Sequence, residues 1–168
     1  MHLRIPGWAR GRPVPGDLYR FADQATGAIR LTVNGQSIGN GLNPDRGFVR
    51  LEREWKSGDF VELILPMPVR RVLAHPNVKD SAGKTALQRG PILYVFEGAD
   101  NGGRVLDLAL PAGVAFKPNL RSEFLGGTVD LEGTLTRSGK QVKATAIPYH
   151  LWSNRGAGEM VVWLPQKD

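Results

Sequence analysis

Cysteine is absent from all 168 residues of the sequence. Disulfide bonds, thiolate metal sites and a cysteine nucleophile are therefore excluded. The three histidines, His2, His75 and His150, are isolated from one another, and none has a second histidine or a carboxylate at the spacing of metal ligands. We therefore predict no metal site, and we expect the histidines to occupy polar loops or interfaces.

Long apolar runs are also missing from the sequence. No stretch approaches the ~20 residues of a membrane span, and the first residues contain no recognisable signal peptide. We predict no membrane segment, and the compartment stays open. The formal net charge is +6, but the basic residues are dispersed, and Arg70 and Arg71 form their densest pair. This pattern favours a generally basic surface over a nucleic-acid-binding stripe.

A complete phosphate-binding loop is missing as well. The segment "SAGKT" at 81–85 resembles the end of such a loop, but Val78 stands where the pattern requires glycine, and no helix pattern follows. We predict a turn between strands at this position. Nowhere does the sequence contain a convincing amphipathic helix longer than two turns.

Glycine and proline, in contrast, are plentiful and scattered, with 21 glycines and 12 prolines. Between them, apolar residues recur at every second position, as in Ile29, Leu31 and Val33 before a turn at Asn34 and Gly35. Further short strands are predicted within 70–75, 91–98, 104–110, 128–135, 141–147 and 159–165. Many short strands without intervening helices predict an all-β sandwich or jelly roll.

The segment 47–67 reads as a hairpin with one exposed face. Its apolar positions lie on one face of two strands that flank a Ser-Gly-Asp turn: Val49, Leu51, Val61, Leu63 and Leu65. Two prolines follow at 66 and 68, and both cannot lie inside a central strand. We therefore predict that the chain leaves one sheet there for another, with domains at 1–69 and 70–168.

Glu97 is the carboxylate that most invites a catalytic interpretation. It ends the apolar run "ILYVF", where the acid of a glycosidase could sit, with Asp100 three residues later. Such chemistry needs a second carboxylate across a cleft, and no partner is evident. We favour a structural role for Glu97, as a partner of Arg89.

Aromatic residues are the other candidates for function. Trp163 alternates with Val161 in a strand that is apolar on both faces, so we predict that Trp163 is buried in a core. Tyr149, Trp152 and Arg155 precede that strand in a segment, 147–165, that reads as two final strands joined by the turn "NRGAG". Aromatic rings with arginine are typical of interfaces. Trp8 and Trp55 are further candidates for contacts with carbohydrate or a neighbouring domain.

Five segments in order resemble one protein family. They are "LRIPGWA" at 3–9, "VNG" at 33–35, "GFVRLEREWKSGDFVELILPMPVR" at 47–70, "ALQRGPILYVFEGADN" at 86–101 and "PYHLWSNRGAGEMVVWLP" at 148–165. Their order and spacing resemble the C-terminal region of glycoside hydrolase family 127, the β-L-arabinofuranosidase-like enzymes. The resemblance is weakest between Gly102 and Ala146.

The resemblance implies two consecutive β-sandwich domains behind a catalytic (α/α)6 barrel. In the family that barrel holds a zinc ion through glutamate and cysteines, and a cysteine is the nucleophile. Because this sequence has no cysteine, no catalytic residue is carried over, and no cofactor is expected in this chain. The resemblance also implies that the first sandwich, 1–69, begins inside a domain. We expect its open strand edges to recruit a second copy of the chain or to be covered by the chain itself.

Two functions remain open. One is a non-catalytic accessory region that supports or caps the catalytic barrel. The other is a carbohydrate-binding module that holds glycan on exposed aromatic faces, which requires coplanar rings that face solvent.

Overall fold

Strands make up nearly all of the regular structure. The computed structural model describes residues 1–24, 27–38 and 42–167. Within those ranges the helical elements are single 3-10 turns: η1 (Gly7–Arg10), η2 (Lys79–Ser81), η3 (Gly98–Asp100) and η4 (Tyr149–Leu151). The predicted all-β fold class is therefore confirmed. In the described ranges, no helix has the length and apolar character needed to cross a membrane.

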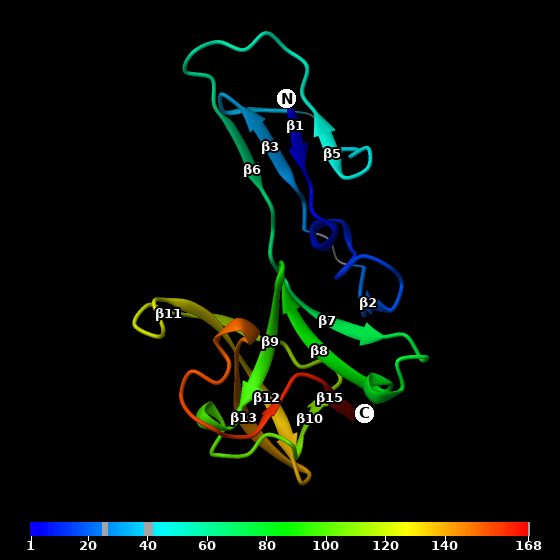
Figure 1. Ribbon diagram of the computed structural model, residues 1–168, viewed down its shortest axis with the longest axis vertical. Coiled ribbons are helices and arrows are strands. Elements are labelled where there is room, and N and C mark those ends of the chain that lie inside the picture. Colours follow the sequence, from blue (N-terminus) through cyan, green and yellow to red (C-terminus); the bar gives the residue numbers. More distant parts are fainter. Residues whose placement is uncertain (25–26, 39–41, 168) are drawn as a thin grey trace.

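Two small sheets form the part of the molecule that we call the first sandwich, drawn in the upper half of Figure 1. One sheet pairs β1 (His2–Arg4) with β5 (Phe48–Arg50), and the other has the order β4 (Gln36–Ser37), β3 (Arg30–Val33), β6 (Val61–Ile64). Side chains from both sheets meet in one buried cluster: Ile5, Ala9, Leu31, Val33, Val49 and Leu51. The predicted inward positions of β3 are thus correct.

The predicted turn between β3 and β4 is also present. Asn34 and Gly35 have φ angles of 51° and 76°, as a two-residue hairpin loop with a primed turn requires. The Asn34 side chain accepts a hydrogen bond from the backbone N–H of Phe60 and donates one to Asp59. This residue therefore also fastens the loop that precedes β6.

The hairpin predicted for 47–67 is wrong, although its buried positions are right. Strand β5 pairs with β1, and β6 pairs with β3, so the two strands lie in opposing sheets. Alternating apolar residues indicate which side chains face the core, and both sheets face the same core. The alternation does not indicate which strand is the neighbour.

The remaining strands form the second sandwich, in the lower half of Figure 1. They are β2 (Tyr19–Phe21), β7 (Val69–Ala74), β8 (Lys84–Arg89), β9 (Ile92–Glu97), β10 (Leu108–Pro111), β11 (Lys117–Arg121), β12 (Thr128–Arg137), β13 (Lys140–Pro148), β14 (Met160–Val161) and β15 (Leu164–Lys167). Six of them, β8, β9, β13, β12, β10 and β15, pair in a closed ring, and β7, β11 and β14 extend it. Pairings are antiparallel except that of β10 with β15, which is parallel.

The core of the second sandwich lies inside this ring. Its largest buried side chains are Tyr94, Phe96, Leu87, Leu108, Leu110, Leu131, Leu135 and Leu164. The buried Tyr94 hydroxyl donates a hydrogen bond to the carbonyl of Val129 at 2.8 Å. Burial of this polar group is therefore compensated, as a core requires.

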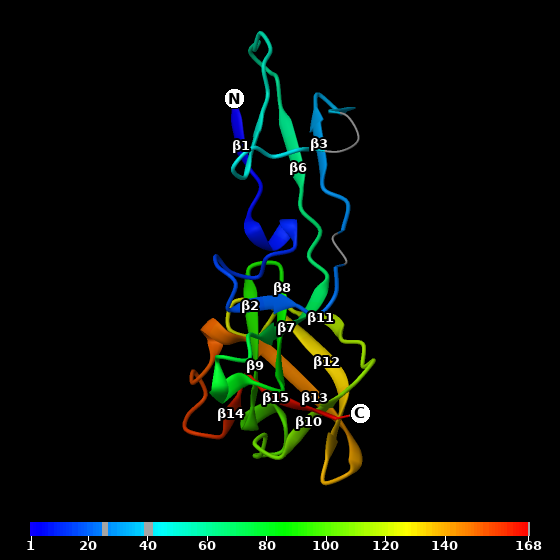
Figure 2. The ribbon, with the colours of Figure 1, turned by 90° about the vertical axis from the view of Figure 1, so that its right-hand side faces the viewer.

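The two sandwiches are joined by residues 65–68, between the end of β6 at Ile64 and the start of β7 at Val69. Figures 1 and 2 show them end to end along the long axis of the molecule. The domain boundary predicted near Val69 falls at the start of β7. Strand β2, although it precedes this position in the sequence, pairs with β7 and so extends the second sandwich.

The hairpin predicted for 147–165 is wrong as well. Strands β13 and β14 pair with opposite sides of β9, so that β9 lies between them. The predicted last strand is broken at Val162 and Trp163, where the chain leaves β9 and β15 continues beside β8 and β10. Trp163 is consequently half-buried rather than internal, and its ring stacks on Tyr19 of β2 at 5.6 Å.

This stacking gives a test of how β2 is held. We expect a double-mutant cycle of Tyr19→Ala and Trp163→Ala to give a coupling energy of about 0.5 to 1.5 kcal/mol, the usual size for an aromatic pair. Urea denaturation of the four proteins in the cycle measures this value. Strictly additive losses would mean that the two rings do not support each other in solution.

Candidate interaction surface

Residues 149–159 form a loop that passes over the end of β9, and we call it the crossing loop. Two large aromatic side chains are exposed on it, Tyr149 at 43% and Trp152 at 40%. Their rings stack on each other, with centroids 6.1 Å apart and planes inclined by 29°. Because each ring covers part of its neighbour, the pair is not a side-by-side platform for a sugar.

Arg155 fastens the crossing loop to the second sandwich. Its guanidinium donates hydrogen bonds to Glu97 at the end of β9 and to Asp100 in η3, with 2.7 Å from Nη1 to Asp100 Oδ1. Glu97 is only 3% exposed, and its other oxygen accepts the backbone N–H of Ser153 at 3.2 Å. The carboxylate predicted to pair with Arg89 therefore pairs with Arg155, and that prediction is corrected. Burial raises the pKa of the Tyr94 hydroxyl, and the nearby charge of Arg89 opposes this increase.

The ion pairs continue from Asp100 to two residues of neighbouring strands. Arg121 of β11 lies 2.6 Å from Asp130 and 3.6 Å from Asp100. The Phe124 ring lies against both guanidiniums, 3.9 Å from that of Arg121 and 4.8 Å from that of Arg155. Three carboxylates and two arginines thus form one charged cluster beneath the crossing loop.

Burial and pairing have opposing effects on each group of this charged cluster, and the pKa values of Arg155 and Asp130 are both raised. The hydrogen bond with Asp100 raises the pKa of the Arg155 guanidinium, so Arg155 stays charged. Burial raises the pKa of the Asp130 carboxyl, despite its bond to Arg121. Asp130 is fully buried, and its Oδ1 atom has no hydrogen-bond partner among the described residues. The cluster is therefore structural, because its carboxylates face arginines rather than an open cleft.

Glu159 fastens the other end of the crossing loop. Its backbone carbonyl accepts the N–H of Gly98 at 2.8 Å, and its Oε2 atom accepts the N–H groups of Val105 and Leu106 at 2.8 and 3.2 Å. The bonds from Val105 and Leu106 lower the pKa of the Glu159 carboxyl, because they favour its charged form. The central part of the loop and its C-terminal end are thus fixed to the second sandwich.

The effect of Glu159 on stability should depend on pH. A carboxyl whose folded pKa is lowered stabilises the protein above its unfolded pKa, about 4.3 for glutamate, and this contribution is lost as the pH falls through the folded pKa. We therefore expect Glu159→Gln to lower the melting temperature at pH 7 and to differ less from wild type as the solution is acidified toward pH 3. Thermal melts of both proteins across this range measure the effect. A constant difference would show that the charge of Glu159 is not involved.

The other predicted site residues lie far from the crossing loop, in the first sandwich. Trp8 and Trp55 are half-buried against its core, and Trp55 also contacts Arg53 at 5.3 Å. They do not form a coplanar pair that faces solvent. The structure brings together Tyr149, Trp152 and Arg155 but leaves the two remaining tryptophans apart.

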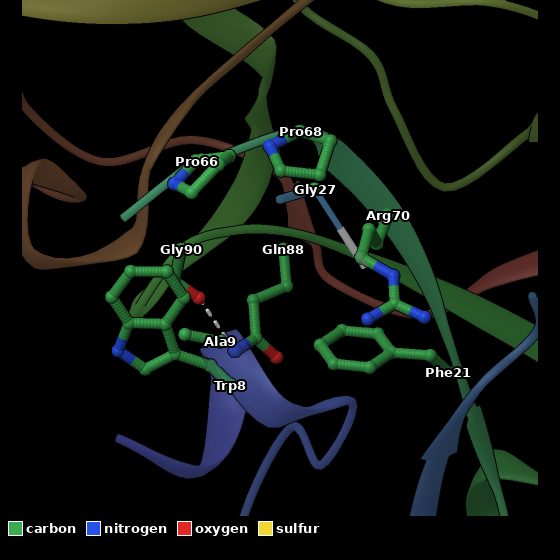
Figure 3. Close-up of a pocket in the computed structure, with 9 residues that line it drawn as sticks. All are labelled: Trp8, Ala9, Phe21, Gly27, Pro66, Pro68, Arg70, Gln88 and Gly90. Atoms are coloured by element: carbon green, nitrogen blue, oxygen red, sulfur yellow. Dashed lines mark hydrogen bonds between the residues drawn. The ribbon is translucent and has the colours of Figure 1, made fainter. Parts of the chain in front are cut away.

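Trp8 reaches the junction of the two sandwiches, which Figure 3 shows in close-up. There the guanidinium of Arg70, 6% exposed, lies 3.6 Å from the Phe21 ring and donates to Asp23 at 3.0 Å. The cavity between these residues has a volume of about 10 Å³, which is too small for a ligand larger than water. The junction is therefore packed rather than open.

The described residues do not indicate a metal site or a phosphate-binding site. They contain no group of three histidine, aspartate or glutamate side chains that could hold a metal ion. With no cysteine, the chain also cannot supply the thiolate ligands of the zinc site implied by the family resemblance. The segment "SAGKT" passes from η2 through a turn into β8, as predicted.

Sequence reasoning missed Arg121 and Asp130 of the charged cluster, the neighbouring Phe124 ring and the role of Glu159. Arg121, Phe124 and Asp130 lie in the stretch where the family resemblance is weakest. The sequence has no local signal for Asp130, because it occupies a polar position in the regular alternation of "TVDLEGTL", on the face opposite Leu131 and Leu135. Its burial depends on segments that are distant in the sequence.

Comparison with known proteins relates both sandwiches to one family. The family model of the GH127 β-L-arabinofuranosidase middle domain matches residues 1–67. That of the glycoside hydrolase family 127 C-terminal domain matches residues 69–165. The two matches meet in the connection between β6 and β7.

Individual relatives agree with this result. A non-reducing end β-L-arabinofuranosidase of Bifidobacterium longum subsp. longum is 32% identical over 184 residues, covering 96% of this chain and 25% of the relative. A solved GH127 β-arabinofuranosidase superposes with a TM-score of 0.90 at 39% identity, covering 99% of this chain and 27% of that one. A GH127 β-L-arabinofuranosidase from Geobacillus stearothermophilus T6 superposes with a TM-score of 0.83 at 36% identity. This match covers 99% of this chain and 26% of the Geobacillus chain. This chain thus spans about a quarter of the length of these relatives, and it belongs to glycoside hydrolase family 127, where it corresponds to the accessory middle and C-terminal domains.

Proposed function

We propose that this chain is a non-catalytic support for the catalytic portion of a family 127 enzyme and contacts that portion through the crossing loop. The observation that carries the proposal is the exposed Tyr149–Trp152 pair, held rigidly by Arg155 and Glu159. Tryptophan, tyrosine and arginine are the residues most enriched where protein interfaces concentrate their binding energy. Fixing the loop in advance lowers the entropy lost on docking.

A chimeric enzyme tests the crossing loop as the contact surface. In it, this chain replaces the matching quarter of the Geobacillus relative. We expect Tyr149→Ala and Trp152→Ala to shorten the half-life of its arabinofuranosidase activity at elevated temperature. Phe60→Ala serves as the control, because Phe60 is 56% exposed on the first sandwich. Equal effects of the loop and control variants would remove the crossing loop from the interface.

The chain by itself should not hydrolyse an aryl β-L-arabinofuranoside, because it cannot supply a cysteine nucleophile or thiolate zinc ligands. Turnover that persisted through repurification and disappeared in Glu97→Gln would contradict the accessory role. Elemental analysis of the purified chain should likewise find no stoichiometric zinc.

Carbohydrate binding through exposed aromatic rings is the alternative function. The exposure of Tyr149 and Trp152 favours it, whereas their mutual stacking opposes it. Titration of the chain with arabino-oligosaccharides, followed by tryptophan fluorescence, distinguishes the two functions. A saturable signal that Trp152→Ala removes would favour the carbohydrate-binding module.

A second copy of the chain is the alternative partner, through the open strand edges predicted for the first sandwich. Sedimentation over a concentration series tests this association. A dimer that persists in Trp152→Ala would place the contact between copies away from the crossing loop.

A further inference from the structure

A second surface of the molecule is a hollow of about 360 Å³ in the side of the second sandwich. One wall consists of residues of β7 and β8, and the other of β11 and the segment before it. Figure 2 shows that both β7 and β11 lie toward the end of the second sandwich nearer the first. This volume is at the lower end of the range for small-molecule sites, and it suits a ligand of about one sugar ring.

Apolar side chains line most of this hollow. They include the rings of Pro68, Phe116 and Pro118, together with Leu87 and Val114. Such ring faces suit the C–H face of a cyclic ligand. Within the described part of the chain, no acidic residue lines the hollow.

Two arginines in the lining have no anionic partner. No ion pair joins Arg71 or Arg89 to a carboxylate within the described ranges. Arg71 donates only to the backbone carbonyls of Pro111 and Val114, at 2.9 and 3.1 Å. Its half-buried position lowers the pKa of its guanidinium, because desolvation disfavours the charge. An anion in the hollow would offset this cost.

Arg89 points to the same kind of ligand. Its Nε–H group is enclosed and has no hydrogen-bond partner in the described structure, so the charge of the guanidinium is incompletely compensated. A carboxylate in the hollow that Arg89 lines would compensate this charge. Arg70, the third arginine of the lining, differs because Asp23 already pairs with it.

We propose that this hollow binds a carboxylate-bearing sugar, a uronate, with its carboxylate on Arg71 and Arg89 and its C–H face against the proline and phenylalanine rings. Arginine is the side chain best suited to a carboxylate, because its planar N–H groups match the two oxygens. This site uses none of the four tryptophans, and it does not depend on the contact assigned to the crossing loop.

A protein segment is the less suitable occupant. A peptide would add to the free edge of β11, but that strand is short and carries Lys117, Pro118 and Arg121. Lysine and proline on an edge strand oppose the addition of another strand. The free edge thus favours a compact ligand that enters the hollow without extending the sheet.

Titration of the 168-residue chain with D-galacturonate, followed by two-dimensional NMR, tests the proposal, with uncharged D-galactose as the matched probe. We expect saturable shifts with galacturonate at amides of β7, β8 and 114–118, and binding of galactose at least about tenfold weaker. Equal binding of the two sugars, or no binding of either, would overturn the proposal. Acetate or glutamate binding as tightly as galacturonate would overturn the sugar assignment and favour an acidic side chain of a protein.

Variants locate the binding within the hollow. Arg89→Gln should weaken galacturonate binding at least about tenfold, whereas Arg50→Gln, which removes the same charge from an exposed position of β5, should not. If Arg89→Gln does not fold, Pro118→Glu tests the same site, because it adds a negative charge at the exposed rim that should repel galacturonate. Phe60→Glu is its control, because it adds the same charge at an exposed position of the first sandwich. Unchanged affinity in Pro118→Glu would overturn the proposal.

Discussion

Replacing Arg155 by methionine is expected to lower the free energy of unfolding by about 3 to 5 kcal/mol, the usual loss when one partner of a buried ion pair is removed. Arg155 is the shared cation of Glu97 and Asp100, whose side chains are 3% and 12% exposed. Methionine fills most of the volume but leaves both carboxylates with less compensation. Because a domain is stabilised by only about 5 to 15 kcal/mol, urea denaturation should show a large shift of the midpoint.

Two further variants separate charge from packing. Arg104→Met is the control, since Arg104 is 70% exposed in its ion pair with Asp107, and surface pairs contribute at most about 1 kcal/mol. Arg155→Met combined with Glu97→Gln should be more stable than Arg155→Met alone, because the more deeply buried of the two carboxylates that pair with Arg155 is then uncharged. Similar small losses in Arg155→Met and Arg104→Met would mean that the charged cluster is well solvated.

Loss of Arg155 should also loosen the crossing loop. Arg155 and Ser153 are the residues of its central part that bond to β9 and η3, through Glu97 and Asp100. Without the guanidinium, the Tyr149–Trp152 pair would have to be ordered during docking, at a cost in conformational entropy. Arg155 would thus link the stability of the chain to formation of the proposed interface.

Much of the fold could be predicted from local sequence, because strands and turns are local features. The apolar alternation of β3 and the Asn34–Gly35 turn identify a strand and its end without any tertiary information. Pairing is different, since it joins residues far apart in the sequence. Val49 and Val61 both face the first core, yet they lie in opposing sheets, and alternation cannot express that difference.

For the candidate surface, too, local features could be predicted from the sequence, whereas contacts between distant residues could not. Aromatic rings beside Arg155 in "PYHLWSNRGAGEM" indicated an interface from composition alone, and the exposure of Tyr149 and Trp152 agrees with that interpretation. The partners of Arg155 come from a strand end more than fifty residues earlier. The position of Glu97 at a strand end can be predicted from the sequence, but its partner cannot, because Arg89 is nearer in sequence than Arg155. Trp163 was placed in a core because the break between β14 and β15 has no local signal.

The first sandwich rests on a small core, and this makes single residues in it important. Among the residues that the structure describes, its buried cluster contains six, compared with eleven in the ring of the second sandwich. Ile5 is the largest fully buried side chain of that cluster, at 1% exposed. It follows β1, and its backbone N–H donates to the carbonyl of Gly47 at 2.7 Å, so it also aligns β1 with β5.

Ile5→Ala should therefore destabilise the first sandwich by about 2 to 5 kcal/mol, the usual cost of such a truncation in a core. The indole N–H signals of the four tryptophans report on the two sandwiches separately, with Trp8 and Trp55 in the first and Trp152 and Trp163 in the second. During a urea titration of Ile5→Ala, the first pair should lose its native signals at a lower concentration than in wild type, ahead of the second pair. His2→Ala is the matched control, because His2 is exposed on the same strand, β1. If all four signals disappeared together at the wild-type midpoint, Ile5 would not hold the first sandwich, and its stability would come from the junction around Arg70 instead.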